Sequence, residues 1–449
     1  MTKPNHSATL GGVTSDPPTG QPRRRGGLWH HLGFRRLWIG ETVSQFGTMI
    51  SQLALPLVAI LVVHAPTFDV GVLTALETAP FVLIGLPAGA WVERMRFRSV
   101  LIVNDLIRAI ALGSIPLAYL LGALTIGQLF AVAFVTGIST VFFDVAYQSY
   151  LPQLVSRAQL VEGNAKLQGS ESVSQIAGPS LGGLLIQALT APYAVLVDAL
   201  SFIWSAAWVA MIRPAPPKPE RKADPNLRRE IGEGLRFVIG NPMLRAISMC
   251  TGSYNFFSSM IAAVFYVLLA RQLHLSAGLI GVITSALAVG GLFGSLVASR
   301  LARWLGQGPV IWISVVASAP FAFVLPFVER NWSLGLLAVA EVMLGMGTVV
   351  YNITQVSFRQ GLCPPDLLGR MNATMRFLVW GTMPLGGLVG GALGAGIGVR
   401  GTLLIAAIGS TLTFLPVYLS PLRRARDLPS HEEVAAGQSL GNPVQVAES

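Results

Sequence analysis

The chain has 449 residues, of which 52% are hydrophobic and only 12% are Asp, Glu, Lys or Arg, about half the ~25% charged share of an ordinary soluble domain. This composition argues against a soluble enzyme. Apolar stretches recur along the whole chain and indicate a polytopic membrane protein whose main partner is the lipid bilayer. The net charge of +10 suits cytoplasmic loops better than a nucleic-acid partner.

Residues 1–33 are polar and rich in Gly, Pro and Ser, which predicts a disordered cytoplasmic tail and no signal peptide. After this tail, apolar runs between charged or Pro/Gly punctuation predict twelve membrane-spanning helices. The expected spans are 37–63, 70–91, 99–121, 125–149, 166–188, 191–212, 245–269, 277–299, 309–328, 332–357, 372–397 and 401–420.

The longest internal connection, 213–243, begins with a Pro-rich string that cannot be helical and is predicted to link two halves, 34–212 and 244–420. Its second part has apolar residues at helical spacing with charges between them. This pattern fits an amphipathic helix on the inner leaflet as well as it fits a solvated linker helix. Residues 421–449 are predicted to be a second disordered cytoplasmic tail.

The basic residues give the orientation. Lys and Arg gather in the two tails and in the connections after the even-numbered spans, while the other connections hold only Arg271, Arg330 and Arg400. Because cytoplasmic loops are enriched in Lys and Arg, both termini are predicted to be cytoplasmic.

An internal duplication is indicated by polar and Gly/Pro punctuation that recurs at a nearly constant offset. The matched features are Ser149 to Asn164 with Ser357 to Asn372, Pro179-Ser-Leu-Gly182-Gly183 with Pro384-Leu-Gly386-Gly387, and Gly85, Gly89 and Arg98 with Gly290, Gly294 and Arg303. The predicted fold class is therefore an all-α polytopic membrane protein, with twelve transmembrane helices in two pseudo-symmetric six-helix halves. Parallel repeats of this kind occur in transporters with a midplane site.

Four stretches resemble a known family. They are Gly89 to Arg98 after span two, Phe143 to Pro152, Ala177 to Gly183 in span five, and Cys363 to Arg370. The chain resembles the twelve-span bacterial efflux branch of the major facilitator superfamily, which includes macrolide-efflux and enterobactin-exporter-like proteins. In the first stretch Glu93 stands where the family has Asp, and Arg96 replaces a glycine.

The resemblance implies a monomeric secondary transporter in the bacterial inner membrane that exports a small amphipathic drug or natural product by proton antiport with alternating access. Many proton-coupled members carry an Arg in span four, whereas the nearest basic residue here is Arg108 in span three. Proton coupling therefore follows from the resemblance and not from a motif. The alternatives are proton-coupled uptake of a metabolite and, from another class, a receptor that does not transport.

Ionisable side chains inside spans are candidates for function because an unpaired charge in a bilayer is unfavourable. Glu77 and Glu341 are the leading candidates for proton coupling or substrate binding. Glu41 and Glu171 are weaker candidates, since snorkelling near helix ends explains them equally well. Asp198 is expected to be interfacial.

Asp105 and Arg108 share one helix face and are expected to pair. The resemblance implies an inner-gate network comprising Gly89, Glu93, Arg94, Arg98, Asp105, Arg108, Asp144, Arg370 and Arg376. It also implies an exporter hinge formed by Gly178, Pro179, Gly182 and Gly183. Gly85 and Gly89, like the hinge glycines, are expected to allow close helix approach. Phe46, Tyr147, Tyr254, Phe257 and Tyr351 are predicted to line the substrate site.

No pattern supports an enzyme, a cofactor or a metal. The two cysteines, Cys250 and Cys363, lack metal-ligand spacing, and the glycine-rich stretch Gly394 to Gly398 has no following Lys-Ser/Thr. ATP drive is therefore not supported.

Overall fold

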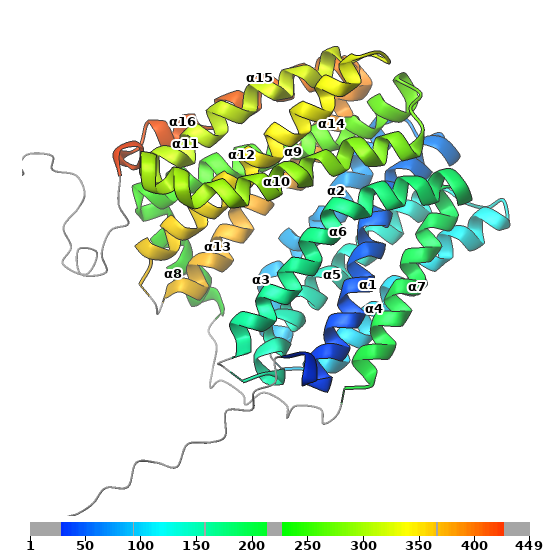
Figure 1. Ribbon diagram of the computed structural model, residues 1–449, viewed down its shortest axis with the longest axis horizontal. Helices are drawn as coiled ribbons and strands as arrows, with labels where there is room; N and C mark the ends of the chain where they lie inside the picture. The colour runs from blue at the N-terminus through cyan, green and yellow to red at the C-terminus, as the bar shows by residue number, and fades with distance from the viewer. Residues whose placement is uncertain (1–27, 93, 157–158, 213–226, 365–366, 426–449) are drawn as a thin grey trace, which may run out of the picture.

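The computed structural model describes residues 28–92, 94–156, 159–212, 227–364 and 367–425, and every regular element in these ranges is helical (Figure 1). The predicted Glu93, the start of the linker and most of both tails lie outside the described residues. The first helical turn, η1 (Leu28–His30), falls inside the predicted N-terminal tail, and its Leu28 is fully buried.

Most of the predicted spans correspond to one helix or to two consecutive helices. In chain order the remaining elements are α1 (Leu32–Leu57), η2 (Val58–Val62), α2 (Thr67–Leu83), α3 (Gly85–Val92), α4 (Phe97–Leu120), α5 (Ile126–Leu154), α6 (Leu160–Leu189), α7 (Ala191–Ala210), α8 (Leu227–Gly240), α9 (Pro242–Val267), η4 (Leu268–Gln272), α10 (Ala277–Leu305), α11 (Gln307–Ser318), η5 (Ala319–Phe327), α12 (Ser333–Leu362), α13 (Leu368–Trp380), α14 (Thr382–Gly396), α15 (Val399–Leu412), α16 (Leu415–Tyr418) and η7 (Pro421–Arg424).

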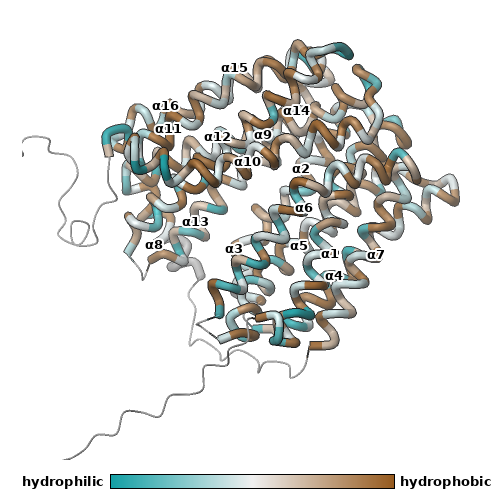
Figure 2. The backbone as a smooth tube through the Cα atoms, in the orientation of Figure 1, coloured by the Kyte–Doolittle hydropathy of each residue, from teal (hydrophilic) through white to brown (hydrophobic). Residues whose placement is uncertain are grey.

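Ten helical segments in the described part of the chain are long and apolar enough to cross a membrane. The predicted spans 70–91 and 166–188 are helical but do not belong to this set. The first is interrupted at Ile84, which leaves α2 with 17 residues and α3 with 8. The second, α6, has 30 residues but includes Glu162, Lys166 and Glu171. In Figure 2, hydrophobic colour runs along most of the helices, and hydrophilic colour gathers toward their ends.

The helices form two groups. In the first, α1 packs against α6 and α7, and α4 packs against α5 and α7. In the second, α9 packs against α14 and α15, and α12 packs against α10 and α11. The amphipathic α8 lies against α13 and α9, with Val238 buried while Leu235 and Ile239 stay exposed.

The two groups meet at one end of the bundle, here called the converging end, which carries the connections 63–66 and 273–276. There α6 crosses α10, and α2 crosses α14. Glycine permits both crossings: a Cβ at Gly281 would overlap the Pro179 carbonyl, and a Cβ at Gly71 would overlap the Gly391 backbone. Toward the opposite, diverging end, the groups splay apart, and α3, α8 and α13 lie there (Figure 1).

Unusual backbone features occur twice along the chain. The π-helical turns η2 and η4 end α1 and α9 in the same way and contact each other. Each is followed by a histidine with positive φ, His64 at 56° and His274 at 49°. Non-glycine residues rarely adopt this conformation, so the recurrence reflects equivalent local structure in the two groups.

Candidate functional site

Two carboxyl groups, one from each helix group, lie near a shared tyrosine. Glu77 on α2 is half-buried, and Glu341 on α12 is buried. Neither carboxyl has a hydrogen bond or ion pair with a described residue. Tyr266 on α9 is close enough to interact electrostatically with both. The two leading sequence candidates therefore lie within electrostatic range of one and the same tyrosine.

Aromatic hydroxyls continue this polar region along α9 and α12. The Tyr254 hydroxyl is 2.5 Å from that of Thr348, and the Tyr351 hydroxyl is 2.6 Å from that of Thr251. The rings of Tyr254 and Tyr351 stack with centroids 6.3 Å apart. Tyr254 also lies within electrostatic range of Glu341. These two predicted lining residues therefore adjoin the carboxyl region, although Tyr351 itself is buried.

The other predicted lining residues are more dispersed. Phe46 and Tyr147 are half-buried in the first group, where Tyr147 stacks on Phe143 with centroids 5.9 Å apart. Phe257 packs against Gly409 of α15 and lines a 530 Å³ cavity bounded by α8, α9 and the α13–α14 segment. It therefore contacts α15, whereas Tyr254 contacts α12.

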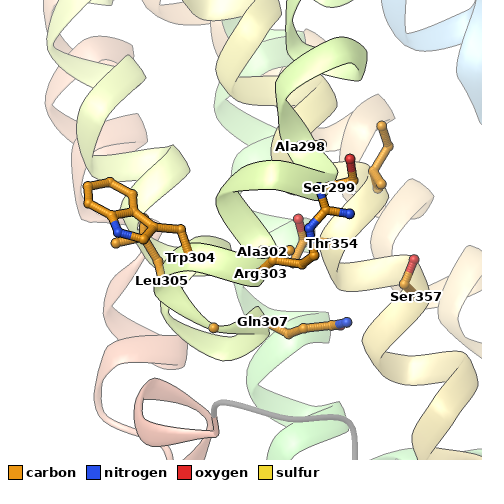
Figure 3. Close-up of a pocket in the computed structure, with 11 residues that line it drawn as sticks. Ala298, Ser299, Ala302, Arg303, Trp304, Leu305, Gln307, Thr354 and Ser357 are labelled. Atoms are coloured by element: carbon orange, nitrogen blue, oxygen red, sulfur yellow. The ribbon is translucent and has the colours of Figure 1, made fainter.

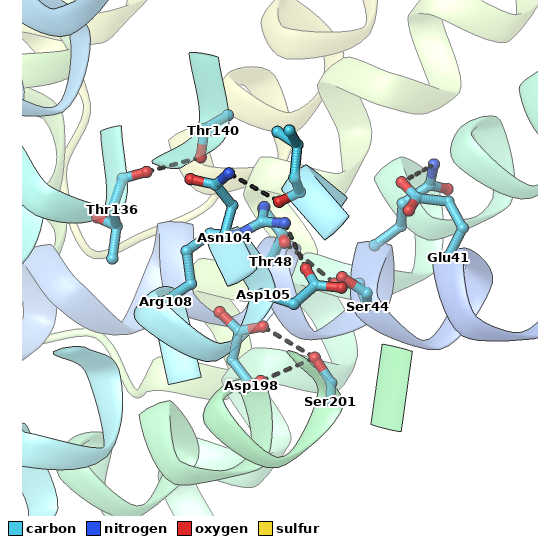
Figure 4. Close-up of polar contacts among 12 residues, drawn as sticks. Glu41, Ser44, Thr48, Asn104, Asp105, Arg108, Thr136, Thr140, Asp198 and Ser201 are labelled. Carbon is cyan, nitrogen blue, oxygen red and sulfur yellow. Dashed lines mark hydrogen bonds and ion pairs between the residues drawn. The ribbon is translucent and has the colours of Figure 1, made fainter. Parts of the chain in front are cut away.

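A buried ion pair occupies the interior of the first group, and Figure 4 shows its surroundings. Arg108 Nη2 is 2.6 Å from Asp105 Oδ1, as their spacing on one helix face predicts. The guanidinium carbon lies over the rings of both Phe143 and Phe202, 4.3 and 4.1 Å from their centroids. The expected pairing of Asp105 and Arg108 is present.

Asp198 belongs to the same interior and is not interfacial as expected. Its residue is 1% exposed, and its carboxylate accepts a 3.0 Å hydrogen bond from Ser201. Gly47 on α1 makes room for it, because a Cβ there would overlap the Ser201 hydroxyl and the Asp198 carboxylate. Sequence reasoning missed this residue because hydropathy placed it near a helix end.

Glu41 and Glu171 differ in their surroundings. Glu41 on α1 is buried, accepts a 3.2 Å hydrogen bond from Gln45 and lies within electrostatic range of Asp105 and Arg108. Glu171 on α6 is half-buried and accepts hydrogen bonds from Gln168 and Gln175 on its own helix. The local bonds of Glu171 match the structural explanation considered for it.

The predicted inner-gate residues within the described ranges make contacts in several parts of the structure. Arg98 donates to the Val209 and Ala210 carbonyls, and Arg94 is exposed. Arg370 on α13 pairs with Glu233 on α8 at 2.5 Å and so ties the linker helix to the second group.

Asp144 and Arg376, which come from different groups, lie within electrostatic range of each other. No ion pair joins them among the described contacts, and the Arg376 guanidinium sits 4.7 Å from the Trp380 ring centroid. Gly85 and Gly89 also differ from expectation, because a Cβ on either would meet no described atom within 4 Å.

The predicted exporter hinge lies at helix crossings. Gly178 and Gly182 face Met49 and Ile50 of α1, and Gly183 faces Ala277 at the start of α10. The expected close approach at these glycines is therefore present, and it includes the contact between the groups.

A residue that sequence reasoning left unassigned joins the groups at the converging end. Arg271, in η4, donates a 2.7 Å hydrogen bond to the Ala65 carbonyl and a 3.5 Å bond to that of Ile60. In the sequence, Arg271 was one of the few basic residues outside the predicted cytoplasmic connections, and this position could have singled it out.

Another cavity lies away from these residues. It measures 720 Å³ between the ends of α10 and α12 and the start of α11, and Arg303, Thr354 and Ser357 line it (Figure 3). None of the predicted lining residues contributes to it. Within the described chain, no group of three or more His, Cys, Asp or Glu side chains could hold a metal ion.

A bundle of apolar helices whose interior holds carboxyls without a partner among the described residues is typical of membrane transporters. The chain matches, over residues 29–444, the family described as transmembrane secretion effector. It therefore belongs to this efflux family of the major facilitator superfamily, which confirms the resemblance and identifies a secondary transporter that exports small molecules.

Several curated relatives are similar over most of their length. The multidrug efflux pump Tap of Mycolicibacterium fortuitum is 26% identical over 82% of this chain and 90% of its own. Macrolide efflux protein A of Streptococcus pyogenes is 24% identical over 83% and 94%, respectively. The enterobactin exporter EntS of Salmonella choleraesuis is 24% identical over 89% and 95%.

Solved structures share the fold. The nucleoside transporter NupG superposes with a TM-score of 0.69 and 14% identity, covering 86% of this chain and 98% of its own. A bacterial homologue of the iron transporter ferroportin, in an inward-facing state, gives the same TM-score at 14% identity, with coverage of 86% and 98%.

Proposed function

We propose that this chain is a proton-driven exporter of an amphipathic drug or natural product, with twelve spans in two six-helix halves that alternate access to a central site. The observation that supports the proposal is that Glu77 and Glu341, from different helix groups, both lie within electrostatic range of Tyr266. Carboxyls without partners in a membrane interior are suited to bind protons or a cationic substrate. Glu41 and Glu171 are the secondary candidates.

The halves are proposed to be 34–212 and 244–420, joined by the linker 213–243 and flanked by tails 1–33 and 421–449. The repeated π-helical turns and positive-φ histidines support equivalence of the two halves. The interrupted α2–α3 and the polar α6 then supply the two spans beyond the ten apolar ones. Both lie at crossings between the groups, where neighbouring helices shelter polar groups and a break in the helix.

The orientation follows from charge. At the diverging end, Arg94 follows α3, Arg303 is in the last turn of α10 and Arg370 is in the first turn of α13. At the converging end, Arg271 is in η4, Arg330 follows η5 and Arg400 is in the first turn of α15. With the more basic end in the cytoplasm, both termini are cytoplasmic in the inner membrane, and this conformation faces inward. We propose a monomer, because the site draws on the two halves of one chain.

The substrate class rests on the relatives. Tap, macrolide efflux protein A and EntS are named as efflux proteins or exporters, which favours export over the alternative of uptake. The aromatic side chains Tyr254, Tyr351 and Phe46 are suited to an amphipathic ligand that carries rings. The predicted inner-gate residues and the hinge Gly178 to Gly183 are assigned to the conformational change.

The first prediction concerns the two carboxyls. We expect Glu77→Gln and Glu341→Gln to lower proton-dependent efflux at least about tenfold, the effect of losing ~1.4 kcal/mol at the limiting step. The measurement is accumulation of antibiotics, dyes and siderophores in pump-deficient cells, before and after the proton gradient is collapsed.

The matched control is Glu329→Gln, since Glu329 is exposed beyond η5 at the converging end. It should leave efflux unchanged. Wild-type export that persists after the gradient is collapsed would contradict proton antiport. Unchanged efflux and pH dependence in both Glu77→Gln and Glu341→Gln would remove these residues from the mechanism.

A further inference from the structure

Three carboxyl groups and one guanidinium are buried together inside the first helix group. Asp105 is 0% exposed, Asp198 1%, Arg108 6% and Glu41 8%. They come from α1, α4 and α7, and α7 packs against both of the other helices. In Figure 4 the side chains of Asp105, Arg108 and Asp198 lie close together, and Glu41 lies farther along α1.

Arg108 is committed to this cluster. One nitrogen binds Asp105 at 2.6 Å, and the guanidinium lies over the phenyl rings of Phe143 and Phe202. Glu41 and Asp198 both lie within its electrostatic range.

The charges do not balance if every carboxyl is ionised. One guanidinium offsets the charge of only one carboxylate. An uncompensated charge in the protein interior is so unfavourable that the ionisable group adopts its neutral form instead. The bonds from Ser201 to Asp198 and from Gln45 to Glu41 supply no charge. Oδ2 of Asp105 and Oε2 of Glu41 are buried without a hydrogen-bond partner in the described structure.

The neighbouring ionisable groups do not correct this imbalance. On α5, Asp144 and Tyr147 lie within electrostatic range of Arg108 and Glu41, respectively. Glu171 on α6 is in turn within range of Asp144 and Tyr147. Asp144, Tyr147 and Glu171 are all acids, so they cannot offset the carboxylates of the cluster. The additional cation, Arg376 of α13, interacts with Asp144.

We propose that Glu41, Asp105 and Asp198 form a proton-binding site around Arg108, which holds protons in this conformation and exchanges them through Glu41. Binding forms an O–H bond between a carboxylate oxygen and a proton taken from water, and release breaks that bond. Glu41 is the exchange point because it is the most exposed of the three and adjoins Tyr147, a half-buried neighbour outside the cluster. The role of this site in transport rests on the proposed proton antiport.

The test is infrared spectroscopy of the purified full chain, which detects the C=O stretch of protonated carboxyls without any substrate. We expect the wild type at neutral pH to show this signal from buried groups. At least two distinct components of this infrared signal should be lost in the set of single variants Glu41→Gln, Asp105→Asn and Asp198→Asn. Raising the bulk pH from about 5 to 9, across the range where perturbed carboxyls titrate, should diminish the component lost in Glu41→Gln.

Two comparisons make the assignment specific. Glu329→Gln, at an exposed carboxyl, should leave the buried signal unchanged, while Glu77→Gln and Glu341→Gln should affect components other than those of the cluster. Each variant's thermal unfolding establishes that it folds. The wild-type pH titration provides a second measurement that does not depend on any substitution.

A signal that none of the three cluster variants alters would overturn the proposal, since the carboxyls would then be ionised. A cluster signal that bulk pH leaves unchanged across the whole range would also overturn it, because the protons would be structural. If the cluster signal depends on pH but the protein shows no gradient-driven efflux, the proton-binding site stands. Only the proposed proton antiport would then be refuted.

Discussion

At the scale of single residues, Gly47 determines whether α7 can approach α1. Its missing side chain leaves space for the Ser201 hydroxyl and the Asp198 carboxylate. Asp198, Ser201 and Ser205 are spaced along one face of α7 and are all buried. A glycine in a helix lowers intrinsic helix stability. At position 47 this loss is accompanied by close packing of α1 against the polar side chains of α7.

We predict that Gly47→Ala destabilises the protein by about 1–3 kcal/mol, the usual range for overpacking a dense interior. The new methyl group would force Asp198 and Ser201 away from α1, and it would disturb the hydrogen bond between them. Thermal unfolding of the purified variant in detergent, relative to wild type, measures this change.

Gly335→Ala on α12 is the matched control, since a Cβ there meets nothing within 4 Å. It should be neutral or slightly stabilising, because alanine is a better helix former. If Gly47→Ala unfolds at the same temperature as Gly335→Ala, the close approach of α1 and α7 is absent in solution.

The residue scale also shows the limits of sequence reasoning. Asp105 with Arg108 was predictable, because both lie on one helix three residues apart. Asp198 and Glu41 joined them only through packing of α1, α4 and α7, which no local spacing encodes. An i, i+3, i+7 pattern of Asp198, Ser201 and Ser205 was present in the sequence as a signal that α7 has a polar buried face.

At the scale of elements, Arg271 fastens η4 to η2 across the converging end. Its guanidinium donates to carbonyls at Ile60 and Ala65, beside a π-helical turn whose bonding pattern differs from that of α1. Hydrogen bonds to charged groups contribute about 1.5–3 kcal/mol. This contact therefore favours the conformation described here over one that opens the converging end.

We predict that Arg271→Gln raises the population opened at the converging end about tenfold or more, since ~1.4 kcal/mol corresponds to a factor of ten. The reporter is a cysteine at Ala65→Cys, which is buried beside the contact, and the measurement is its rate of labelling by a maleimide. The native Cys250 and Cys363 are both buried and should add little background.

Arg400→Gln is the control for this experiment. Arg400 lies at the same end but donates to the Pro326 and Val328 carbonyls within the second group, so labelling at position 65 should not change. Equal labelling rates with and without Arg271→Gln would show that this residue does not hold the converging end together.

Helix positions along the chain were largely predictable, because long apolar runs need internal backbone hydrogen bonding in a bilayer. The departures occur where packing outweighs composition. The interruption at Ile84 between α2 and α3 has a proline on each side, Pro80 and Pro87. The polar inner half of α6 remains helical beside α1, and only the part from Gly178 to Gly183 meets close neighbours through glycine.

At the scale of the whole molecule, sequence repeats predicted a duplication but not which ends of the two groups touch. That arrangement depends on long-range contacts such as Gly183 with Ala277 and Gly71 with Gly391, which have no local signature. The positive-inside rule supplies the direction of the bundle. Combining the two gives the orientation proposed above, in which the structure faces inward. That orientation predicts that α6 and α10 separate at their crossing during transport.

A disulfide across that crossing tests this motion. Ser180 on α6 and Ser285 on α10 have hydroxyl oxygens 2.8 Å apart, and side chains this close are suited to the short Cβ separation that a disulfide needs. We predict that Ser180→Cys combined with Ser285→Cys forms the bond under mild oxidation and abolishes export, and that a reductant restores it. Thiol titration of the denatured protein counts the bond, and each single variant controls for its substitution. A bonded protein that exports at the wild-type rate would show that α6 and α10 stay together throughout the cycle, and alternating access by separation of the two groups at this crossing would then be wrong.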